Sequence, residues 1–192
     1  MTFGISVIIE NGLQEIFGAD TRRLNSGALE TASLIFPGDL FIGVFPLLIF
    51  AVAIVVILVI QFIFYHTEIG RAFRATSDDP VTAELMGINN RHLYALATGI
   101  AFAVTGIAGV FLAIRSNFDP SMGPSRLIFA FESIIIGGLG NPWGTLIGAI
   151  ILGIAQAIGS AYSLQWSLLS GHFAFLVVLL WRPNGLFPRM GE

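Results

Sequence analysis

The sequence predicts an all-α integral membrane protein, because it is strongly hydrophobic, poor in charge and contains long charge-free runs. Of its 192 residues, 55% are hydrophobic and 11% are charged, and the mean hydropathy is +0.85. A soluble domain carries about 25% charged residues. Residues 41–65 and 93–114 form charge-free runs of 25 and 22 residues, and about 20 apolar residues suffice for a helix to cross a bilayer core. We therefore expect residues 1–192 to form one polytopic helical bundle with about five to six transmembrane segments.

The charge and cysteine content exclude several classes of protein. The nine basic residues are all arginine and the formal net charge is -3. This balance provides neither a nucleic-acid patch nor a polybasic lipid anchor. The chain has no cysteine, which excludes disulfides and thiolate metal sites. We expect no nucleic-acid partner and no metal centre.

The first predicted segment covers residues 3–17 and is followed by a loop at 18–40 rich in turn-forming residues. No basic region or small-residue cleavage site precedes it, so a signal peptide is not expected. Glu10 and Asn11 interrupt its apolar run. This favours a helix that packs inside a larger bundle, and hence a chain that is an incomplete version of a longer protein.

The remaining segments follow from charge-free runs and breaks. Residues 41–65 and 93–114 are the next two, and Pro46 is expected to cause at most a mild kink. Asn141-Pro142 and a turn-rich stretch near 159–171 divide the later apolar region. The three resulting segments are 127–140, 143–162 and 168–181. The first would extend only ~21 Å against a bilayer core of ~30 Å, which predicts a short or broken helix.

A polar island at residues 66–92 separates the second and third segments. If all six segments cross, this island and both termini share one side of the membrane. That side carries five arginines against four on the other, and the positive-inside rule then favours a cytoplasmic loop.

The island contains the pattern of a short helix at 79–87. Asp79 followed by Pro80 is typical of an N-cap and a first helical residue, and Gly87 suits a helix C-terminus. A helix of about two turns is not stable alone, so it predicts a docking partner. An ordinary linker remains the alternative. Arg71 and Arg74 are expected to pair with acidic groups or to lie against phospholipid head groups.

Small residues recur in the apolar region after the island. Gly140, Gly144 and Gly148 are spaced by four, and a neighbouring row contains Ala149, Gly153, Ala157 and Ala161. Small residues let membrane helices approach closely. We expect helix packing or a subunit interface at Gly144, Gly148, Gly153 and Ala157, with direct lining of a path as the alternative.

Glu132 is the only acid within a hydrophobic segment after the island. Ionised groups in a membrane are costly unless they are paired or wet, and a broken helix exposes polar backbone groups. The sequence therefore offers two hypotheses for this residue: a translocation path or gate, and an interhelical hydrogen bond or interface anchor. The path or gate would comprise Glu132, Gly137, Gly138 and Gly140.

Other polar residues have simpler expected roles. Gln156 and His172 are expected to be hydrogen-bonded structural partners within the bundle, and Asn117 and Asp119 to lie on the external face. The sequence has no H-E-x-x-H, Walker A or G-x-S-x-G motif. In GGLGN, Asn141 stands where intramembrane aspartyl proteases have an aspartate. We expect no catalytic residue and no bound cofactor.

Three blocks of the sequence resemble the permease subunits of branched-chain amino acid ABC importers, the LivH/LivM family. They are GRAFRATSDDPVTAELMGIN, FAFESIIIGGLGNPWGTLIGAIILGIAQAIG and LLWRPNGLFPR, and the similarity runs in order from about Gly4 to Arg189. The resemblance implies a multi-pass permease of a bacterial or archaeal inner membrane that translocates branched-chain or related hydrophobic amino acids. It also implies a second permease subunit in a homo- or heterodimer, a cytoplasmic ABC ATPase dimer that uses ATP and Mg, and a periplasmic solute-binding protein.

By this resemblance the island at 66–92 is a coupling loop whose helix docks on the ATPase. The matching positions are Gly70, Arg71, Ala72, Arg74, Ala75, Asp78, Ala83, Leu85, Gly87 and Ile88, to which the predicted cap adds Asp79. Family members are longer, and this chain resembles their C-terminal part. Two rival hypotheses are an ion-coupled secondary carrier and a truncated, non-transporting permease remnant.

Overall fold

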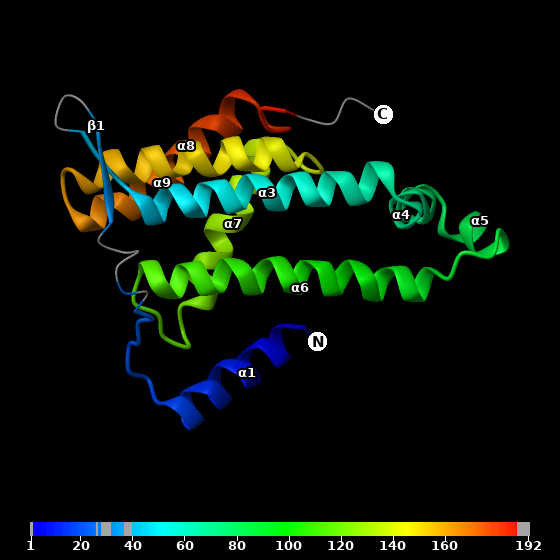
Figure 1. The fold of residues 1–192 in the computed structure, drawn as a ribbon, viewed down its shortest axis with the longest axis horizontal. Helices are drawn as coiled ribbons and strands as arrows, with labels where there is room; N and C mark the ends of the chain where they lie inside the picture. The colour runs from blue at the N-terminus through cyan, green and yellow to red at the C-terminus, as the bar shows by residue number, and fades with distance from the viewer. Residues whose placement is uncertain (1, 26, 28–31, 37–39, 188–192) are drawn as a thin grey trace. The chain divides into compact units, whose positions relative to one another are not determined.

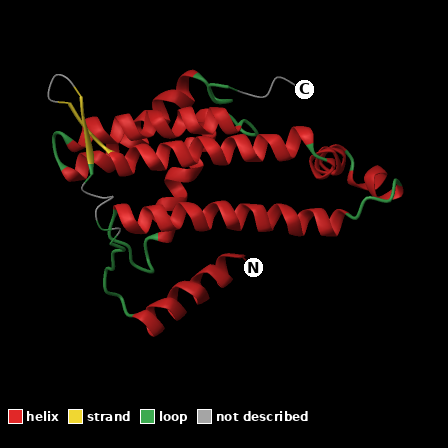
Figure 2. Cartoon of the chain, in the orientation of Figure 1, coloured by secondary structure: helices red, strands yellow, loops and turns green. Residues whose placement is uncertain are grey.

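The computed structural model describes residues 2–25, 27, 32–36 and 40–187, and eight helices account for most of them (Figures 1 and 2). The elements, labelled as in Figure 1, are α1 (Thr2–Phe17), β1 (Ser33–Phe36), β2 (Leu40–Gly43), α3 (Val44–His66), α4 (Glu68–Asp78), α5 (Pro80–Leu85), α6 (Asn90–Arg115), α7 (Gly123–Gly137), α8 (Pro142–Ser160) and α9 (Leu164–Trp181). The predicted all-α class is confirmed, apart from one short pair of strands.

Four helices in the described part of the chain are long and apolar enough to cross a membrane, namely α3, α6, α8 and α9. This is fewer than the five to six segments predicted. The segment predicted at 3–17 forms α1, with 16 residues, and the one predicted at 127–140 forms α7, with 15 residues. At ~1.5 Å per residue neither helix extends across a core of ~30 Å. The expectation of a short helix near 127–140 is confirmed.

Two paired strands replace part of the loop predicted at 18–40 and the start of the helix predicted at 41–65 (Figure 2). Strands β1 and β2 pair antiparallel, with Ser33 opposite Gly43. Helix α3 consequently begins at Val44 rather than at residue 41. Pro46 is its third residue and lies in the first turn. Backbone N–H groups there have no intrahelical acceptor, so the proline removes no helical hydrogen bond.

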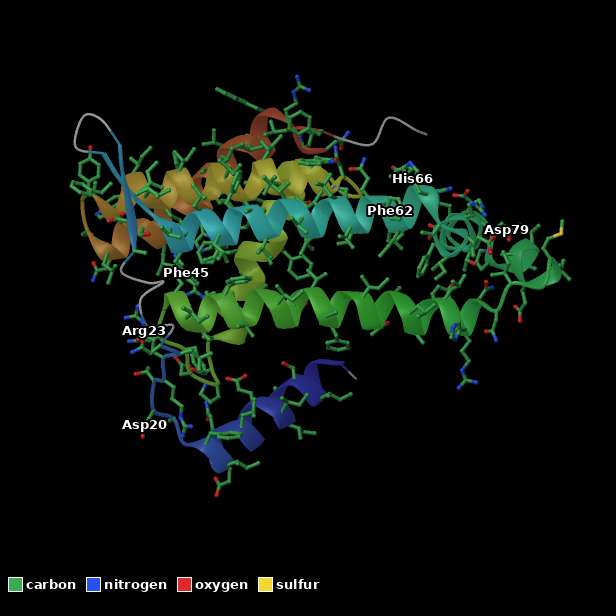
Figure 3. The ribbon with its side chains drawn as sticks, viewed as in Figure 1. Asp20, Arg23, Phe45, Phe62, His66 and Asp79 are labelled. Carbon is green, nitrogen blue, oxygen red and sulfur yellow. The ribbon has the colours of Figure 1, made fainter. Side chains whose placement is uncertain are left out.

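The chain divides into two compact units, residues 20–119 and residues 1–19 with 120–192. In the first unit, residues 22–24 bond to the C-terminal end of α6. Arg22 and Phe118 exchange two backbone hydrogen bonds of 2.8 Å, and Leu24 N–H donates to Ala113 O. Figure 3 shows Arg23 at this end of α6 and Asp79 towards the opposite end.

The second unit contains α1 and three packed helices, α7, α8 and α9, of which α8 contacts both of the others. Ile136 and Leu152 are buried between them, with 1% and 4% of their surface exposed. Glycine makes this approach possible. A Cβ on Gly144 would overlap the Gly137 carbonyl, and a Cβ on Gly148 would overlap the Ser133 carbonyl. The α7–α8 contact is therefore a backbone-to-backbone contact of the kind that small residues permit in membranes.

Candidate functional site

The polar island folds into two helices rather than the single helix predicted at 79–87. Helix α4 covers Glu68–Asp78 and α5 covers Pro80–Leu85. Helix α4 was not predicted from the sequence, although its N-cap residue, Thr67, is recognisable there. The Thr67 hydroxyl accepts from Gly70 N–H at 3.2 Å and donates to Ile63 O at 2.6 Å. Thr67 therefore joins the end of α3 to the start of α4.

Gly70 and Arg74 fix α4 against the last turn of α3. Gly70 is buried, and a Cβ at this position would overlap the carbonyls of Ile63 and Phe64. The Arg74 guanidinium donates to Phe64 O and lies 5.6 Å from the ring centroid of Tyr65. Cation–π contact and a satisfied helix C-terminus both favour this arrangement. The two residues thus position the island relative to the membrane-spanning helix.

Arg71 behaves as predicted and Arg74 differs. Arg71 forms an exposed ion pair with Glu68 at 3.4 Å, a contact that contributes little stability by itself. Arg74 donates to a backbone carbonyl instead of to an acid. Of the other predicted coupling positions in α4, Ala72 is half-buried, and Ala75 and Asp78 are exposed.

Asp79 caps α5 as predicted. Its carboxylate accepts hydrogen bonds from Val81 N–H at 3.0 Å, from Thr82 N–H at 3.2 Å and from the Thr82 hydroxyl at 2.5 Å. Hydrogen bonds from Thr82 hold the pKa of Asp79 below its ordinary value of 3.8. The bond from the Thr82 hydroxyl is the main cause and the bond from the Thr82 N–H is the next. The ionised form is the better acceptor, so Asp79 is a charged cap at neutral pH.

The C-terminal end of α5 also lies where the sequence predicts it. Gly87 has a φ of +87°, a conformation that favours glycine. Ile88 N–H donates to Ala83 O at 3.0 Å, and Gly87 N–H donates to Glu84 O at 3.0 Å. Glycine thus turns the chain back towards α6 directly after the helix.

Asn90 and Thr76 tie the island together, and the sequence analysis missed both. Thr76, with 3% of its surface exposed, donates to Asn90 Oδ1 at 2.9 Å, and Asn90 Nδ2 donates to Pro80 O at 2.7 Å. One asparagine therefore connects α4, α5 and α6. The polar composition of residues 66–92 suggested a solvated loop, in which such specific contacts are not apparent.

The outer surface of α5 is apolar and exposed. Val81, Leu85 and Met86 have 69%, 83% and 80% of their surface exposed, whereas Ala83 on the inner side has 4%. A helix capped at both ends that presents large apolar side chains is suited to docking in a groove of another protein. Among the predicted coupling residues, Leu85 is the most exposed apolar one, and its contact with an ATPase stays a prediction.

A second polar site lies between α7 and α9. Glu132 has 6% of its surface exposed, and its Oε1 lies 2.5 Å from Nδ1 of His172. The His172 ring stacks on Phe129, with centroids 5.0 Å apart. Both polar residues were singled out in the sequence, but their separation of 40 residues gave no reason to pair them. The pairing confirms the expected structural partner for His172.

The α7–α8 turn is closed by the chain that follows α9. Gly138 and Gly140 have φ angles of +97° and +81°. Leu186 N–H donates to Ile136 O at 2.8 Å, and Phe187 N–H donates to Gly137 O at 3.2 Å. The backbone acceptors at the end of α7 are therefore bonded within the chain. A translocation role for Gly137, Gly138 and Gly140 stays a prediction.

The two small-residue rows of α8 lie in different surroundings. Gly144 and Gly148 are buried against α7. Nothing lies within 4 Å of a Cβ built on Gly153, and Ala157 is exposed. The Gln156 carbonyl accepts from the Ser167 hydroxyl of α9 at 3.1 Å. Packing at Gly153 and Ala157 against another helix stays a prediction.

Two further predictions concern the end of α6 and metal ions. Asn117 is exposed and Asp119 is half-buried, and they flank Phe118, which pairs with Arg22. Over the described residues, no group of three His, Asp or Glu side chains is arranged to hold a metal ion.

Comparison with known proteins gives the family. Residues 1–181 match the family described as branched-chain amino acid transport system / permease component. No solved structure matches the chain.

Three curated relatives illustrate the similarity. The branched-chain amino acid transport permease BraD of Pseudomonas aeruginosa is 28% identical over 97% of this chain and 62% of its own length. LivH of Escherichia coli is 34% identical over 73% of this chain and 46% of its own length. LivM of Escherichia coli is 24% identical over 93% of this chain and 44% of its own length. The chain thus spans about half to two-thirds of the length of these relatives, and it belongs to the branched-chain amino acid transport permease family.

Proposed function

We propose that this chain is a membrane subunit of an ATP-driven ABC importer that moves branched-chain or related hydrophobic amino acids. The family match over residues 1–181 supports the transport class, and the printed names of the relatives support the class of solute. Four helices suited to a membrane agree with a bacterial or archaeal inner-membrane location. ATP and Mg would be used by a separate ATPase.

We infer that α4 and α5 form the coupling element. The observation that carries this inference is the exposed apolar surface of α5, formed by Val81, Leu85 and Met86. The element is held to α3 by Gly70 and Arg74 and to α6 by Asn90. A force applied to α5 would therefore reach two candidate spanning helices through direct contacts rather than through a loose loop.

The remaining partners follow from the same proposal. Residues 22–24 and 117–119 lie at the end of α6 opposite to α5 and would face the solute-binding protein (Figure 3). The uncovered small-residue row at Gly153 and Ala157 would pack against a second permease subunit or against further helices of the importer. Glu132 would lie on the translocation path.

Co-purification with a candidate ATPase tests the coupling element. The Leu85→Glu variant places a charge on the proposed docking surface, so we expect loss of the complex and of solute-stimulated ATP hydrolysis. Asn117→Glu adds the same charge at the other end of α6 and should leave the complex intact. Equal retention of the ATPase by both variants would contradict the proposal.

A further inference from the structure

The Glu132–His172 pair lies near the middle of a candidate spanning helix. His172 follows the first residue of α9, Leu164, by eight residues and precedes the last, Trp181, by nine. At ~1.5 Å per residue it lies about 12–14 Å from each end. The pair therefore lies near the centre of the bilayer when α9 spans it, where polar groups are rare and tend to mark solute pathways.

The surroundings of the pair determine how it holds its protons. Glu132 Oε1 and His172 Nδ1 lie 2.5 Å apart, and Glu132 Oε2 is buried with no hydrogen-bond partner among the described residues. A net charge at this depth with an unsatisfied carboxylate oxygen is strongly disfavoured. A pair that is neutral overall, with one proton between Oε1 and Nδ1, avoids this cost.

A neutral pair fixes the chemistry of the other ring nitrogen. A neutral pair holds a second proton, on Nε2 of His172 or on Oε2 of Glu132. A proton on the buried Oε2 would have no acceptor, so the arrangement with the hydrogen on Nε2, which makes Nε2 a donor, is favoured. One face of the ring stacks on Phe129, and the side chain is still 42% exposed. The described part of the chain provides no acceptor for Nε2. The site thus offers an N–H group to a ligand that carries an acceptor.

We propose that Nε2–H of His172 binds the carboxylate of the translocated amino acid and that Glu132 is the positioning residue that maintains this tautomer. The proposal rests on the proposed function and adds the part of the solute that is recognised. A carboxylate only accepts hydrogen bonds, whereas an ammonium group only donates them, so the donor at Nε2 selects the carboxylate end. A neutral site also carries no net charge when the solute has left.

Nuclear magnetic resonance of histidine nitrogens in the full chain, held in lipid nanodiscs, tests this proposal. The probes are leucine, 4-methylpentanoate, which has the carboxylate without the amine, and 3-methylbutylamine, which has the amine without the carboxylate. We expect leucine and 4-methylpentanoate to shift the Nε2 resonance of His172 and 3-methylbutylamine to leave it unchanged. His66 and His92 are internal references, and His172→Phe provides the assignment.

Variants separate positioning from packing. His172→Phe keeps an aromatic ring against Phe129 and removes the donor, so apparent affinity for both carboxylates should fall about ten- to a hundredfold. His172→Gln retains an N–H donor and should recover part of the affinity. Glu132→Gln retains a group that donates to Nδ1 and should bind carboxylates within a few-fold of the native chain.

Three outcomes would overturn the proposal: a response to the amine alone, loss of carboxylate binding in Glu132→Gln, or a His172 resonance that responds only to assembly with a second subunit. The binding measurement needs no ATPase, so it is separable from the proposed function. Carboxylate binding at His172 without ATP-driven uptake would refute the importer and retain the site. Uptake that is equal in the native chain and in His172→Phe would refute the site and retain the importer.

Discussion

Single glycines set how closely α7 and α8 approach. Gly148 and Gly153 both lie inside α8, yet a Cβ on Gly148 would overlap the Ser133 carbonyl and a Cβ on Gly153 would meet nothing within 4 Å. The two glycines have the same helical backbone conformation but different surroundings. They therefore form a matched pair for measuring the contribution of close packing.

Gly148→Ala should destabilise the chain by about 1–3 kcal/mol, because the added methyl group forces two backbones apart. Gly153→Ala should be neutral or stabilising by up to about 1 kcal/mol, because alanine leaves the unfolded chain less conformational freedom than glycine does. Unfolding of both variants in detergent, followed by circular dichroism, measures the difference. A Gly148→Ala variant as stable as Gly153→Ala would show that the α7–α8 contact is looser than the structure indicates.

Asp79 makes the order of α5 dependent on pH. Its pKa is lowered in the folded chain, mainly by the Thr82 hydroxyl. A lowered folded pKa means that the capping stability is fully present above the ordinary value of 3.8 and is lost as the pH falls through the folded pKa. We expect the protection of the Val81 and Thr82 amides, measured against their intrinsic exchange rates, to fall in that acidic range.

Asp79→Ala should show low protection of the Val81 and Thr82 amides at neutral pH. In Asp79→Asn the protection, taken relative to the intrinsic exchange rate at each pH, should not change between about pH 2 and about pH 5, where a carboxylate cap titrates. Protection of native Val81 and Thr82 that is unaffected by acid would contradict a charged cap.

At the scale of the element, the island at residues 66–92 depends on a network and not on α5 alone. The Thr76 hydroxyl donates to Asn90, which donates in turn to Pro80. Removing one buried member leaves the next without its partner, which costs about 1–3 kcal/mol in measured cases. The island should therefore loosen as a unit.

Thr76→Val keeps the shape of the side chain and removes its hydroxyl. We expect proteolysis within residues 78–90 to become faster, while the exposed neighbour Ser77 tolerates substitution by alanine without effect. Limited proteolysis in lipid nanodiscs compares the two variants. Equal cleavage rates would mean that the polar link contributes nothing to the order of the island.

The elements also show what the sequence predicts well and what it does not. The Asp79 cap, the Gly87 turn and the short helix near 127–140 are local patterns, and each is confirmed. The pairing of Glu132 with His172, the Asn90 link and the closure of α7 by residues 186–187 join residues that are distant in sequence. Such contacts are set by tertiary packing, which periodicity and capping rules do not encode.

Hydrophobicity alone also misplaced some boundaries. The run from residue 41 is apolar throughout, but its first residues pair with Ser33–Phe36 as a strand before α3 begins. Helix α4 was missed because the charged residues around Arg71 resemble a solvated loop. Its inner side is nevertheless packed on α3 through Gly70.

At the scale of the whole molecule, many apolar side chains are uncovered in the chain alone. In α3 these include Val55, Phe62 and Tyr65, each at least half exposed. Lipid, further helices or another subunit must cover such surfaces in a membrane. This agrees with a chain that spans about half to two-thirds of the length of its relatives.

The proposed function requires that α5 lies on the ATPase side of the membrane and contacts the ATPase. The chain has no cysteine, so Leu85→Cys, in α5, and Asn117→Cys, just after α6, each introduce a single labelling site, and the 26-residue helix α6 separates the two sites. A membrane-impermeant maleimide should label Leu85→Cys only in inside-out vesicles and Asn117→Cys only in right-side-out vesicles, and bound ATPase should protect Leu85→Cys alone. Labelling of Leu85→Cys from outside the cell, or labelling that the ATPase leaves unchanged, would contradict the account.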